Sequence, residues 1–285
     1  MLHLFFIFIS GLILGSFLNV VINRTKAAEP FRLKNFLGRS HCPECGKKIH
    51  WFDNIPLLSF FLLNGRCRYC RKKISLQYPL VEFFTAALAV ILIYFKFRFT
   101  PLPPVFFNLA FFCFFAQAGL LILILAALVC VFVYDLKTFL IPDQFVLFGA
   151  FAALARNLCL DLSAGRFSPF EPGSFLAGSA TIKGFLAALL ASGFFFLLVF
   201  FSKEKWMGWG DVKFAVSMGL VLGFPSILVG LFLAFFIGSI TGLMLIIKKT
   251  KTLKSQIPFG PFLCLGTYLA FIFAPGIIDW YLGYF

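Results

Sequence analysis

The chain has 285 residues, of which 61% are hydrophobic and 13% are charged. This composition excludes a water-soluble globular protein, because only a bilayer, which is crossed by stretches of about 20 apolar residues, needs so much apolar surface. Lys and Arg number 25 against 11 Asp and Glu. In a membrane protein such an excess of positive charge marks the loops that stay in the cytoplasm.

The first predicted element is an apolar run over residues 1–23, which contains no Lys, Arg, Asp or Glu and precedes a basic cluster that begins at Arg24. A secretory signal has its positive charge before the apolar run and a small-residue cleavage site after it. The order here is the reverse, so we predict a membrane helix with its N-terminus outside. Gly11 and Gly15 form a G-x-x-x-G step that would let another helix approach closely. Glycines that the helix merely tolerates are the alternative.

Residues 24–78 form the one long polar segment and hold twelve of the 25 basic residues. The segment contains two C-x-x-C pairs separated by 21 residues: Cys42, Cys45, Cys67 and Cys70. Pairs near this spacing present four thiolates in a tetrahedron and predict a structural zinc ribbon. Two disulfides or a redox pair are the alternatives, which a reducing cytoplasm disfavours. We expect the basic residues to contact anionic lipid headgroups. We expect no nucleic-acid binding, because no aromatic platforms or fold signature accompany them.

The rest of the chain consists of apolar runs joined by shorter polar segments. The runs cover about residues 79–95, 105–134, 139–160, 183–201, 214–247 and 258–280. The run 214–247 is long for one span and short for two, but Gly223-Phe224-Pro225 supplies a turn that would divide it. Division gives eight helices, with twenty basic residues in the cytoplasm and five outside. We therefore predict an all-α polytopic membrane protein of about eight transmembrane helices with a small cytoplasmic zinc-ribbon-like loop domain.

Three parts are expected: residues 1–23 as the first transmembrane helix, residues 24–78 as the cytoplasmic zinc-binding loop, and residues 79–285 as a membrane core of seven helices. The sixth predicted helix, residues 214–223, covers only about half a bilayer. Either Asp211 lies at membrane depth or the turn after this helix dips in from outside. Both arrangements imply a water-accessible cavity in the protein, because irregular backbone at that depth must not face lipid.

Asp135, at the inner end of the third predicted helix, and Asp211, at the start of the sixth, are expected on the same side of the membrane because two helices separate them. Carboxylates at the edge of a bilayer are costly and are functional candidates. Two that converge can share one proton, so that one draws a proton from water and the other protonates a leaving group. Such a pair hydrolyses a peptide bond without a metal. The alternative is that each Asp caps a helix or pairs with Lys137 or Lys213.

Two further acids lie near predicted helix starts. Asp143 follows Pro142, where a carboxylate suits the helix dipole, so a cap is its expected role. Glu82, in the run 79–95, is either a helix-start charge or part of the lining of the same cavity.

In their order along the chain, these motifs resemble those of prepilin peptidases, the bifunctional leader peptidase/N-methyltransferases of type IV pilus and type II secretion systems. The matching segments are Gly15-Ser16-Phe17-Leu18-Asn19-Val20-Val21, Asn54-Ile55-Pro56-Leu57-Leu58-Ser59 between the paired cysteines, Tyr78-Pro79-Leu80-Val81-Glu82, Asp135 with Ile141-Pro142-Asp143, Gly208-Trp209-Gly210-Asp211-Val212-Lys213, and Pro258-Phe259-Gly260-Pro261. Any one segment is weak, but the order of all of them is specific and runs nearly from end to end.

The resemblance implies an aspartic endopeptidase with Asp135 and Asp211 as the catalytic pair. It therefore favours catalysis over the alternative that each Asp caps a helix or pairs with a lysine. It implies cleavage of a prepilin or pseudopilin after a Gly at the end of a short basic leader, and methylation of the new N-terminal residue with S-adenosylmethionine. The enzyme would lie in the bacterial cytoplasmic (inner) membrane with its active site facing the cytoplasm. The paired cysteines are the form expected of bifunctional members, so residues 24–78 would be the methyltransferase part. No Gly-rich loop there indicates which residues hold the methyl donor.

Two other functions agree with parts of the pattern. An intramembrane G-x-G-D protease of the presenilin or signal-peptide-peptidase kind also uses two membrane aspartates, but it lacks a zinc ribbon between its first two helices. A non-enzymatic zinc-ribbon assembly factor of a secretion apparatus would tolerate replacement of both aspartates.

Overall fold

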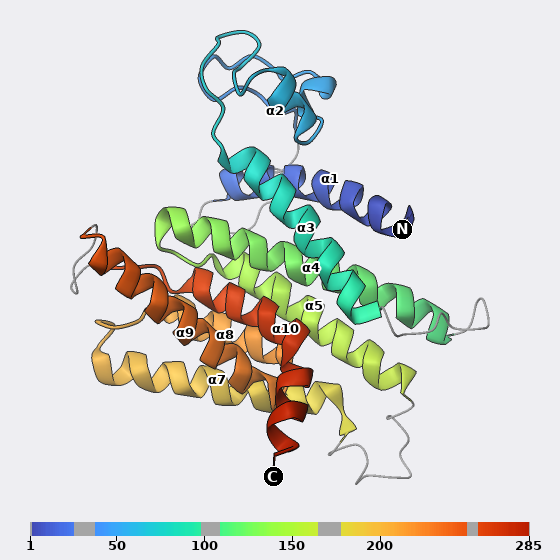
Figure 1. Ribbon diagram of the computed structural model, residues 1–285, viewed down its shortest axis with the longest axis vertical. Helices are drawn as coiled ribbons and strands as arrows, with labels where there is room; N and C mark the ends of the chain where they lie inside the picture. Colours follow the sequence, from blue (N-terminus) through green and yellow to red (C-terminus); the bar gives the residue numbers. More distant parts are fainter. Residues whose placement is uncertain (1, 26–37, 98–108, 165–177, 250–255, 285) are drawn as a thin grey trace. The chain divides into compact units, whose positions relative to one another are not determined.

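The computed structural model describes residues 2–25, 38–97, 109–164, 178–249 and 256–284. These residues are largely helical and include no β-strand, only isolated β-bridges. The chain divides into two compact units, Met1–Phe99 and Thr100–Phe285, whose helices are labelled in Figure 1. The all-α fold is confirmed. The three-part division expected from the sequence concerns function and stays a prediction.

The first unit has two long helices that pack against each other through small residues. Its helical elements are α1 (Leu2–Arg24), η2 (Trp51–Asn54), α2 (Leu58–Leu62) and α3 (Gln77–Phe97). A Cβ added to Gly11 would lie 2.6 Å from Ala86 Cα, and one added to Gly15 would lie 2.7 Å from Glu82 Cα. A larger side chain fits at neither position. The prediction of a close helix contact at the G-x-x-x-G step is therefore confirmed.

Residues 38–76, which lie between α1 and α3 in the sequence, form a small lobe (Figure 1). This lobe carries η2, α2 and both C-x-x-C pairs. Each pair lies in a short turn that is closed by an isolated antiparallel bridge, His41 with Lys48 in one turn and Arg66 with Lys73 in the other. The two turns, and not an extended sheet, therefore give the lobe its shape.

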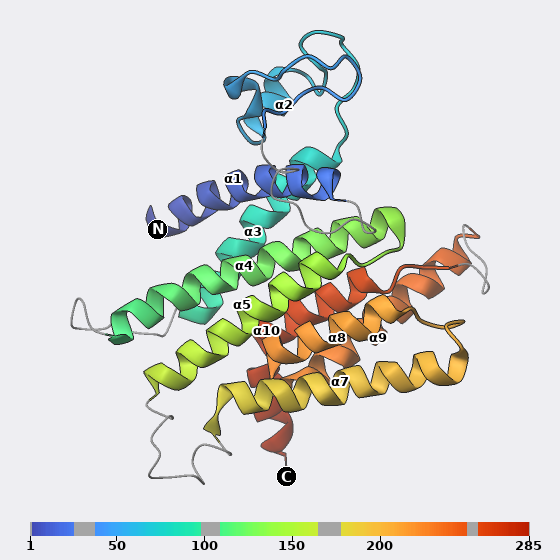
Figure 2. The same cartoon turned by 180° about the vertical axis from the view of Figure 1, so that it is seen from behind.

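The second unit is built around one short helix. Its elements are α4 (Leu109–Thr138), α5 (Asp143–Ser163), α7 (Ala180–Ser202), α8 (Trp209–Leu222), α9 (Ser226–Ile247) and α10 (Gly260–Leu282). α8 packs against α5, α7 and α10 (Figure 2), and its Phe214, Ala215 and Met218 are buried. A Cβ on Gly219 would lie 2.3 Å from Ala188 Cα of α7, so α7 and α8 touch backbone to backbone. The middle and the second half of α8 are therefore packed closely among the neighbouring helices.

Seven helices of the described residues are long and apolar enough to cross a membrane: α1, α3, α4, α5, α7, α9 and α10. The chain is therefore a multi-pass membrane protein. The eighth predicted span corresponds to α8, which has 14 residues and is about 21 Å long. The predicted break is confirmed, because α8 ends at Leu222, Gly223 has a φ of 68°, and α9 begins at Ser226. α8 starts at Trp209, earlier than the expected residue 214, with Gly208 as its N-cap residue and Asp211 in its first turn.

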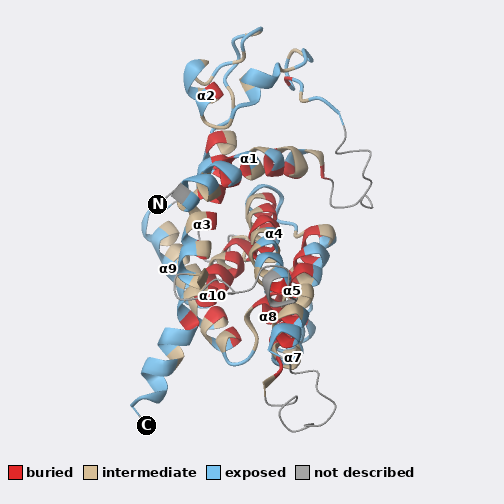
Figure 3. Cartoon of the chain, turned by 90° about the vertical axis from the view of Figure 1, so that its right-hand side faces the viewer, coloured by how far each residue is buried: buried red, intermediate tan, exposed pale blue. Residues whose placement is uncertain are grey.

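Large apolar side chains cover the outer faces of these helices. On α9, Leu228, Phe232 and Phe236 recur at every fourth position and are all exposed. Residues at this spacing form one stripe along a helix. Figure 3 shows exposed residues along such faces and buried residues on the opposite ones. In a protein that crosses a membrane, this stripe faces lipid.

Candidate active site

Asp135 is buried in the last turn of α4. The helix ends there because Phe139 has a φ of 57° and donates its amide to the Asp135 carbonyl at 2.9 Å. Among the described residues, Oδ2 of Asp135 has no hydrogen bond of normal geometry, although the Gly260 amide is close enough to interact with the carboxylate. Its close neighbour is the backbone of Gly260, the first residue of α10, where an added Cβ would lie 2.5 Å from Oδ2. A buried carboxylate oxygen without a partner is costly, which indicates a functional role.

Asp211 is buried in the first turn of α8, after the N-cap residue Gly208. The Gly208 amide donates to Asp211 Oδ2 at 3.4 Å. In a capping box, the side chain of the third helical residue accepts from the N-cap amide in this way. The capping alternative is therefore partly true of Asp211. A bond of this length is weak, so capping alone does not explain why a carboxylate is buried here.

The ends of α4, α8 and α10 converge at the two aspartates. Asp135 and Asp211 are near enough to interact electrostatically, and the buried Cys264 of α10 lies in the neighbourhood of both. Ile141 lies between the glycines of the other two helices. A Cβ on Gly210 would be 3.2 Å from Ile141 Cβ, and one on Gly260 would be 3.2 Å from Ile141 Cδ1. Three segments that are far apart in the sequence thus form one site.

Lys213 pairs with Asp143 and not with either buried aspartate. Its Nζ lies 2.8 Å from both carboxylate oxygens of Asp143, and both side chains are more than half exposed. Asp143 is the first residue of α5, so its carboxylate also lies at the N-terminus of a helix, as expected. The ion-pair alternative is therefore wrong for Asp211 with Lys213.

A small cavity lies between α4, α5, α8 and α10, and its lining is apolar apart from Ser217 and Thr267. Neither Asp135 nor Asp211 lines it. The water-accessible cavity expected at the aspartates stays a prediction.

In the first unit, Glu82 is buried and its Oε2 accepts the Leu57 amide at 2.8 Å. Asn19 donates to the Tyr78 carbonyl at 3.1 Å, and Gln77 donates to Asn19 Oδ1 at 3.3 Å. These bonds join α1, α3 and the residue that precedes α2. They give Glu82 a partner within its own unit, and they tie Asn19 to the start of α3.

The four cysteines of the lobe lie together as a metal site requires. Their Sγ atoms are all within 4.8 Å of one another, and those of Cys42 and Cys70, from different turns, are 3.9 Å apart. Four sulfurs bound to one zinc ion at about 2.3 Å would lie about 3.8 Å from one another. The backbone amides of Cys70 and Tyr69 lower the pKa of Cys67 to about 7, which favours the thiolate that binds metal. The donor set and its spacing therefore fit zinc.

The two cysteine turns repeat the same backbone pattern. Cys42 donates to the Lys47 carbonyl and accepts from the Gly46 amide, and Cys67 donates to the Lys72 carbonyl and accepts from the Arg71 amide. Gly46 and Arg71 both have positive φ, 67° and 59°. The repeat is visible in the sequence as His41–Lys48 and Arg66–Lys73, which share C-x-x-C-x-K-K. The cysteine spacing alone does not reveal it.

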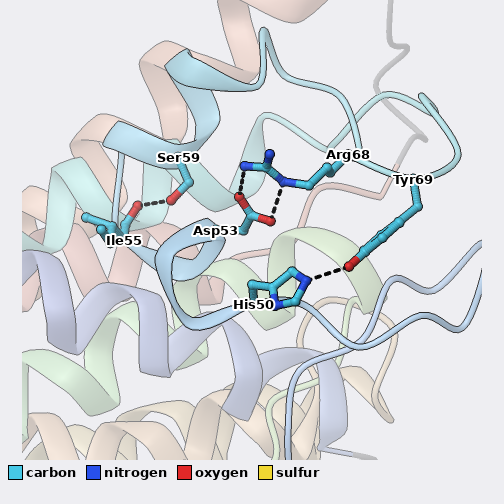
Figure 4. A network of polar contacts seen from close by, with 6 residues as sticks. All are labelled: His50, Asp53, Ile55, Ser59, Arg68 and Tyr69. Carbon is cyan, nitrogen blue, oxygen red and sulfur yellow. Dashed lines mark hydrogen bonds and ion pairs between the residues drawn. The ribbon is translucent and has the colours of Figure 1, made fainter.

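Polar and aromatic contacts join η2 to the second turn, and Figure 4 shows the polar ones. Arg68 donates to both oxygens of Asp53 at 2.8 and 2.6 Å, and this bond lowers the pKa of Asp53. His50 Nε2 and Tyr69 Oη are 2.7 Å apart, and the His50 ring stacks on Phe52. These contacts occupy His50, and the metal-binding cluster among the described residues consists of cysteines alone.

Comparison with known proteins matches both units to one enzyme family. Residues 9–97 match the Bacterial Peptidase A24 N-terminal domain, and residues 121–243 match the Type IV leader peptidase family. A prepilin leader peptidase/N-methyltransferase of Aeromonas salmonicida is 31% identical over 99% of this chain and 94% of its own length. The chain belongs to the type IV leader peptidase family. This is a family of aspartic peptidases, so the chain is an enzyme.

Other relatives extend the same result. Prepilin leader peptidase/N-methyltransferases of Legionella pneumophila and Pseudomonas aeruginosa are each 30% identical, over 96% and 95% of this chain and 92% and 91% of their own lengths. No solved structure matches the chain. The resemblance expected from the ordered motifs is therefore confirmed, and the leader peptidase match covers both Asp135 and Asp211.

Proposed function

We propose that this leader peptidase removes the basic leader of a prepilin or pseudopilin and methylates the new N-terminus, with Asp135 and Asp211 as its catalytic pair. The observation that carries the proposal is the convergence of the two aspartates at the ends of α4 and α8. The similarity to prepilin leader peptidase/N-methyltransferases over nearly the whole chain supports both activities.

The peptidase step follows from two carboxyl groups that share one proton. The ionised carboxylate takes a proton from a water molecule, and the water oxygen attacks the scissile carbonyl carbon. The protonated carboxyl then donates its proton to the leaving amine nitrogen as the C–N bond breaks. This chemistry requires one of the two carboxyl groups to hold the shared proton, and two carboxyl groups that lie close together meet this requirement because they cannot readily both be ionised. Gly210 and Gly260 have no Cβ, so Ile141 and the Asp135 carboxylate can pack directly against the backbones of α8 and α10.

Cys42, Cys45, Cys67 and Cys70 would hold a structural zinc ion, which cross-links the two turns of the lobe. Zinc with four thiolate ligands has no open position for substrate, so its role is structural. S-adenosylmethionine, when bound, supplies the methyl group. We assign methylation to residues 24–78 and peptide hydrolysis to residues 79–285, with residues 1–23 as the first membrane helix.

The proposed location is the bacterial cytoplasmic membrane, with the aspartates on the cytoplasmic side. Arg24, Lys137, Lys203 and Lys248 lie in or next to the last turns of α1, α4, α7 and α9. Loops rich in Lys and Arg remain in the cytoplasm, and Asp135 lies in the same turn as Lys137. A pilin anchored by its apolar helix would then present its leader junction at this face.

The test is to reconstitute the full chain in phospholipid vesicles with a prepilin and isotope-labelled S-adenosylmethionine. Cleavage and methylation are scored separately by mass spectrometry. The proposal expects cleavage after a Gly at the membrane face, followed by label on the new N-terminus. Cleavage within the transmembrane segment of the substrate would indicate a presenilin-like activity instead. Absence of both cleavage and methylation would contradict the proposal and favour the assembly-factor function.

A further inference from the structure

We infer that the exposed face of α2 lies in the lipid headgroup region of the bilayer and anchors the zinc-binding lobe to the membrane surface. The α2 face is defined by Leu58, Phe61 and Leu62. The inference depends only on the membrane-spanning helices of the first unit, and not on the proposed catalysis.

Within the part of the chain that the structure describes, the α2 face is apolar and exposed. Leu58, Phe61 and Leu62 are 52%, 69% and 73% exposed. Positions i, i+3 and i+4 lie on one side of a helix, which is the spacing that normally faces a core. Three large apolar side chains that point outward at this spacing indicate a surface that binds something apolar.

The opposite side of α2 is occupied by the lobe itself. Ser59 is buried and its hydroxyl donates to the Ile55 carbonyl, as Figure 4 shows. The ring of Phe60 lies over Gly65, where an added Cβ would be 3.0 Å from Phe60 Cζ. α2 is therefore held with one side inward, so the α2 face cannot turn into the lobe.

The depth of α2 relative to the membrane follows from Glu82. The Leu57 amide, directly before α2, donates to Glu82 Oε2 at 2.8 Å. Glu82 lies about 7 Å inside α3, counted from its first residue Gln77 at 1.5 Å per residue. α3 has 21 residues, so it is about 31 Å long and just crosses the apolar core of a bilayer. The start of α2 is thus held about 7 Å from one end of α3, which is within the ~5–10 Å depth that the apolar face of an interfacial helix reaches.

The charge of the lobe matches an anionic lipid surface. Its described residues 38–76 include eight Lys and Arg but only two carboxylates, Glu44 and Asp53. Lys72 pairs with Glu44, and Arg68 pairs with Asp53. The excess stays positive even if four thiolates bind one divalent zinc ion and together add two negative charges. A basic lobe with an apolar helix face at the core boundary is typical of an interfacial membrane anchor.

The test places a photoreactive side chain on each side of α2. In the full chain, Phe61→p-benzoylphenylalanine probes the α2 face and Phe60→p-benzoylphenylalanine is the matched control, one residue away and facing inward. Both variants are placed in nanodiscs of phosphatidylethanolamine and phosphatidylglycerol, irradiated and digested. We expect phospholipid adducts at position 61, and adducts only to residues of the lobe at position 60.

Adducts at position 61 to the same chain, to a second copy or to an added prepilin, without lipid adducts, would overturn the inference. Equal lipid adducts at positions 60 and 61 would overturn it as well, because they would mean that α2 has no fixed side. Leu62→p-benzoylphenylalanine gives a second site on the α2 face if the Phe61 variant fails to fold. The readout is independent of cleavage, so a failed anchor and a failed peptidase assignment are distinguishable.

Discussion

The two units build their candidate sites in opposite ways. In the lobe of the first unit, the four cysteines lie in two short turns, and the contacts that position each thiol come from within a few residues. In the second unit, Asp135 and Asp211 depend on helix ends that meet across α4, α8 and α10. A site made by local turns is readable from sequence spacing, whereas a site made by helix packing depends on the whole unit. A substitution that disrupts one site should therefore leave the other site largely intact.

The largest effect is expected from Asp135→Asn and Asp211→Asn. Each should reduce leader cleavage at least about 100-fold, because an amide keeps the size of the side chain but cannot take or hold the shared proton. The measurement is cleavage of a prepilin by the reconstituted variant. Methylation of a pilin that already lacks its leader is the control and should persist. Substantial cleavage by either variant would contradict the catalytic assignment.

Replacing a zinc-binding cysteine should have the reverse effect, with methylation impaired more than cleavage. Cys42→Ser and Cys67→Ser should lose the roughly one zinc ion per chain that four cysteines hold. They should loosen the lobe and impair methylation more than cleavage, because the aspartates lie on other helices. Metal analysis in reducing buffer, with Cys159→Ser as the matched control, measures the zinc. A wild-type chain without zinc would rule out the metal site.

Gly260→Ala tests the packing of α10 against Asp135. The new methyl group would lie 2.5 Å from Asp135 Oδ2, so the carboxylate or the helix must move. Cleavage should fall roughly tenfold or more, because displacement of a catalytic group by about 1 Å is costly. Gly276→Ala in the same helix meets nothing within 4 Å and should keep its activity. Equal activity of the two variants would show that the packing of Gly260 against Asp135 does not matter for cleavage.

Asp143→Asn should have a small effect, in contrast to the same substitution at the buried aspartates. The amide oxygen can still accept from Lys213, and an exposed ion pair contributes only about 0–1 kcal/mol. Cleavage should stay within a few-fold of wild type, and the thermal midpoint should change little. A loss as large as that of Asp135→Asn would make Asp143 a third essential carboxylate.

The smallest effects concern the two matching turns of the lobe. Gly46→Ala should destabilise the lobe by about 1 kcal/mol, because its φ of 67° disfavours a Cβ. Arg71→Gly should stabilise the lobe by up to about 1 kcal/mol, since Arg71 has a φ of 59° without being a glycine. Hydrogen exchange of the lobe amides measures both. Shifts of the same sign would show that the turns are not equivalent.

The sequence predicted most of the helices and the cysteine cluster, because both depend on local pattern. The break at Gly223–Pro225 was predictable from turn chemistry, whereas the start of α8 at Trp209 was not. The residues before Phe214 interrupt the apolar run, although Trp209–Lys213 form the first part of α8.

The role of Gly260 beside Asp135 lay beyond the sequence for a different reason. It arises from a contact between the end of α4 and the start of α10, which no local pattern encodes. The ordered family motifs indicated that Asp135 and Asp211 matter, while spacing alone left a cap or an ion pair open. Contacts between helices that are far apart in the sequence could therefore be identified only from the structure.

The separation of the two carboxyl groups tests the central claim most directly. An experimentally determined structure of the full chain in lipid, with a bound prepilin peptide, would measure it. Two groups that share a proton through one water molecule should lie within about 6 Å of each other. We predict this distance between Asp135 and Asp211, with the cleft open to the cytoplasmic face. Carboxyl groups on opposite faces of the membrane, or more than about 15 Å apart with substrate bound, would contradict the catalytic pair.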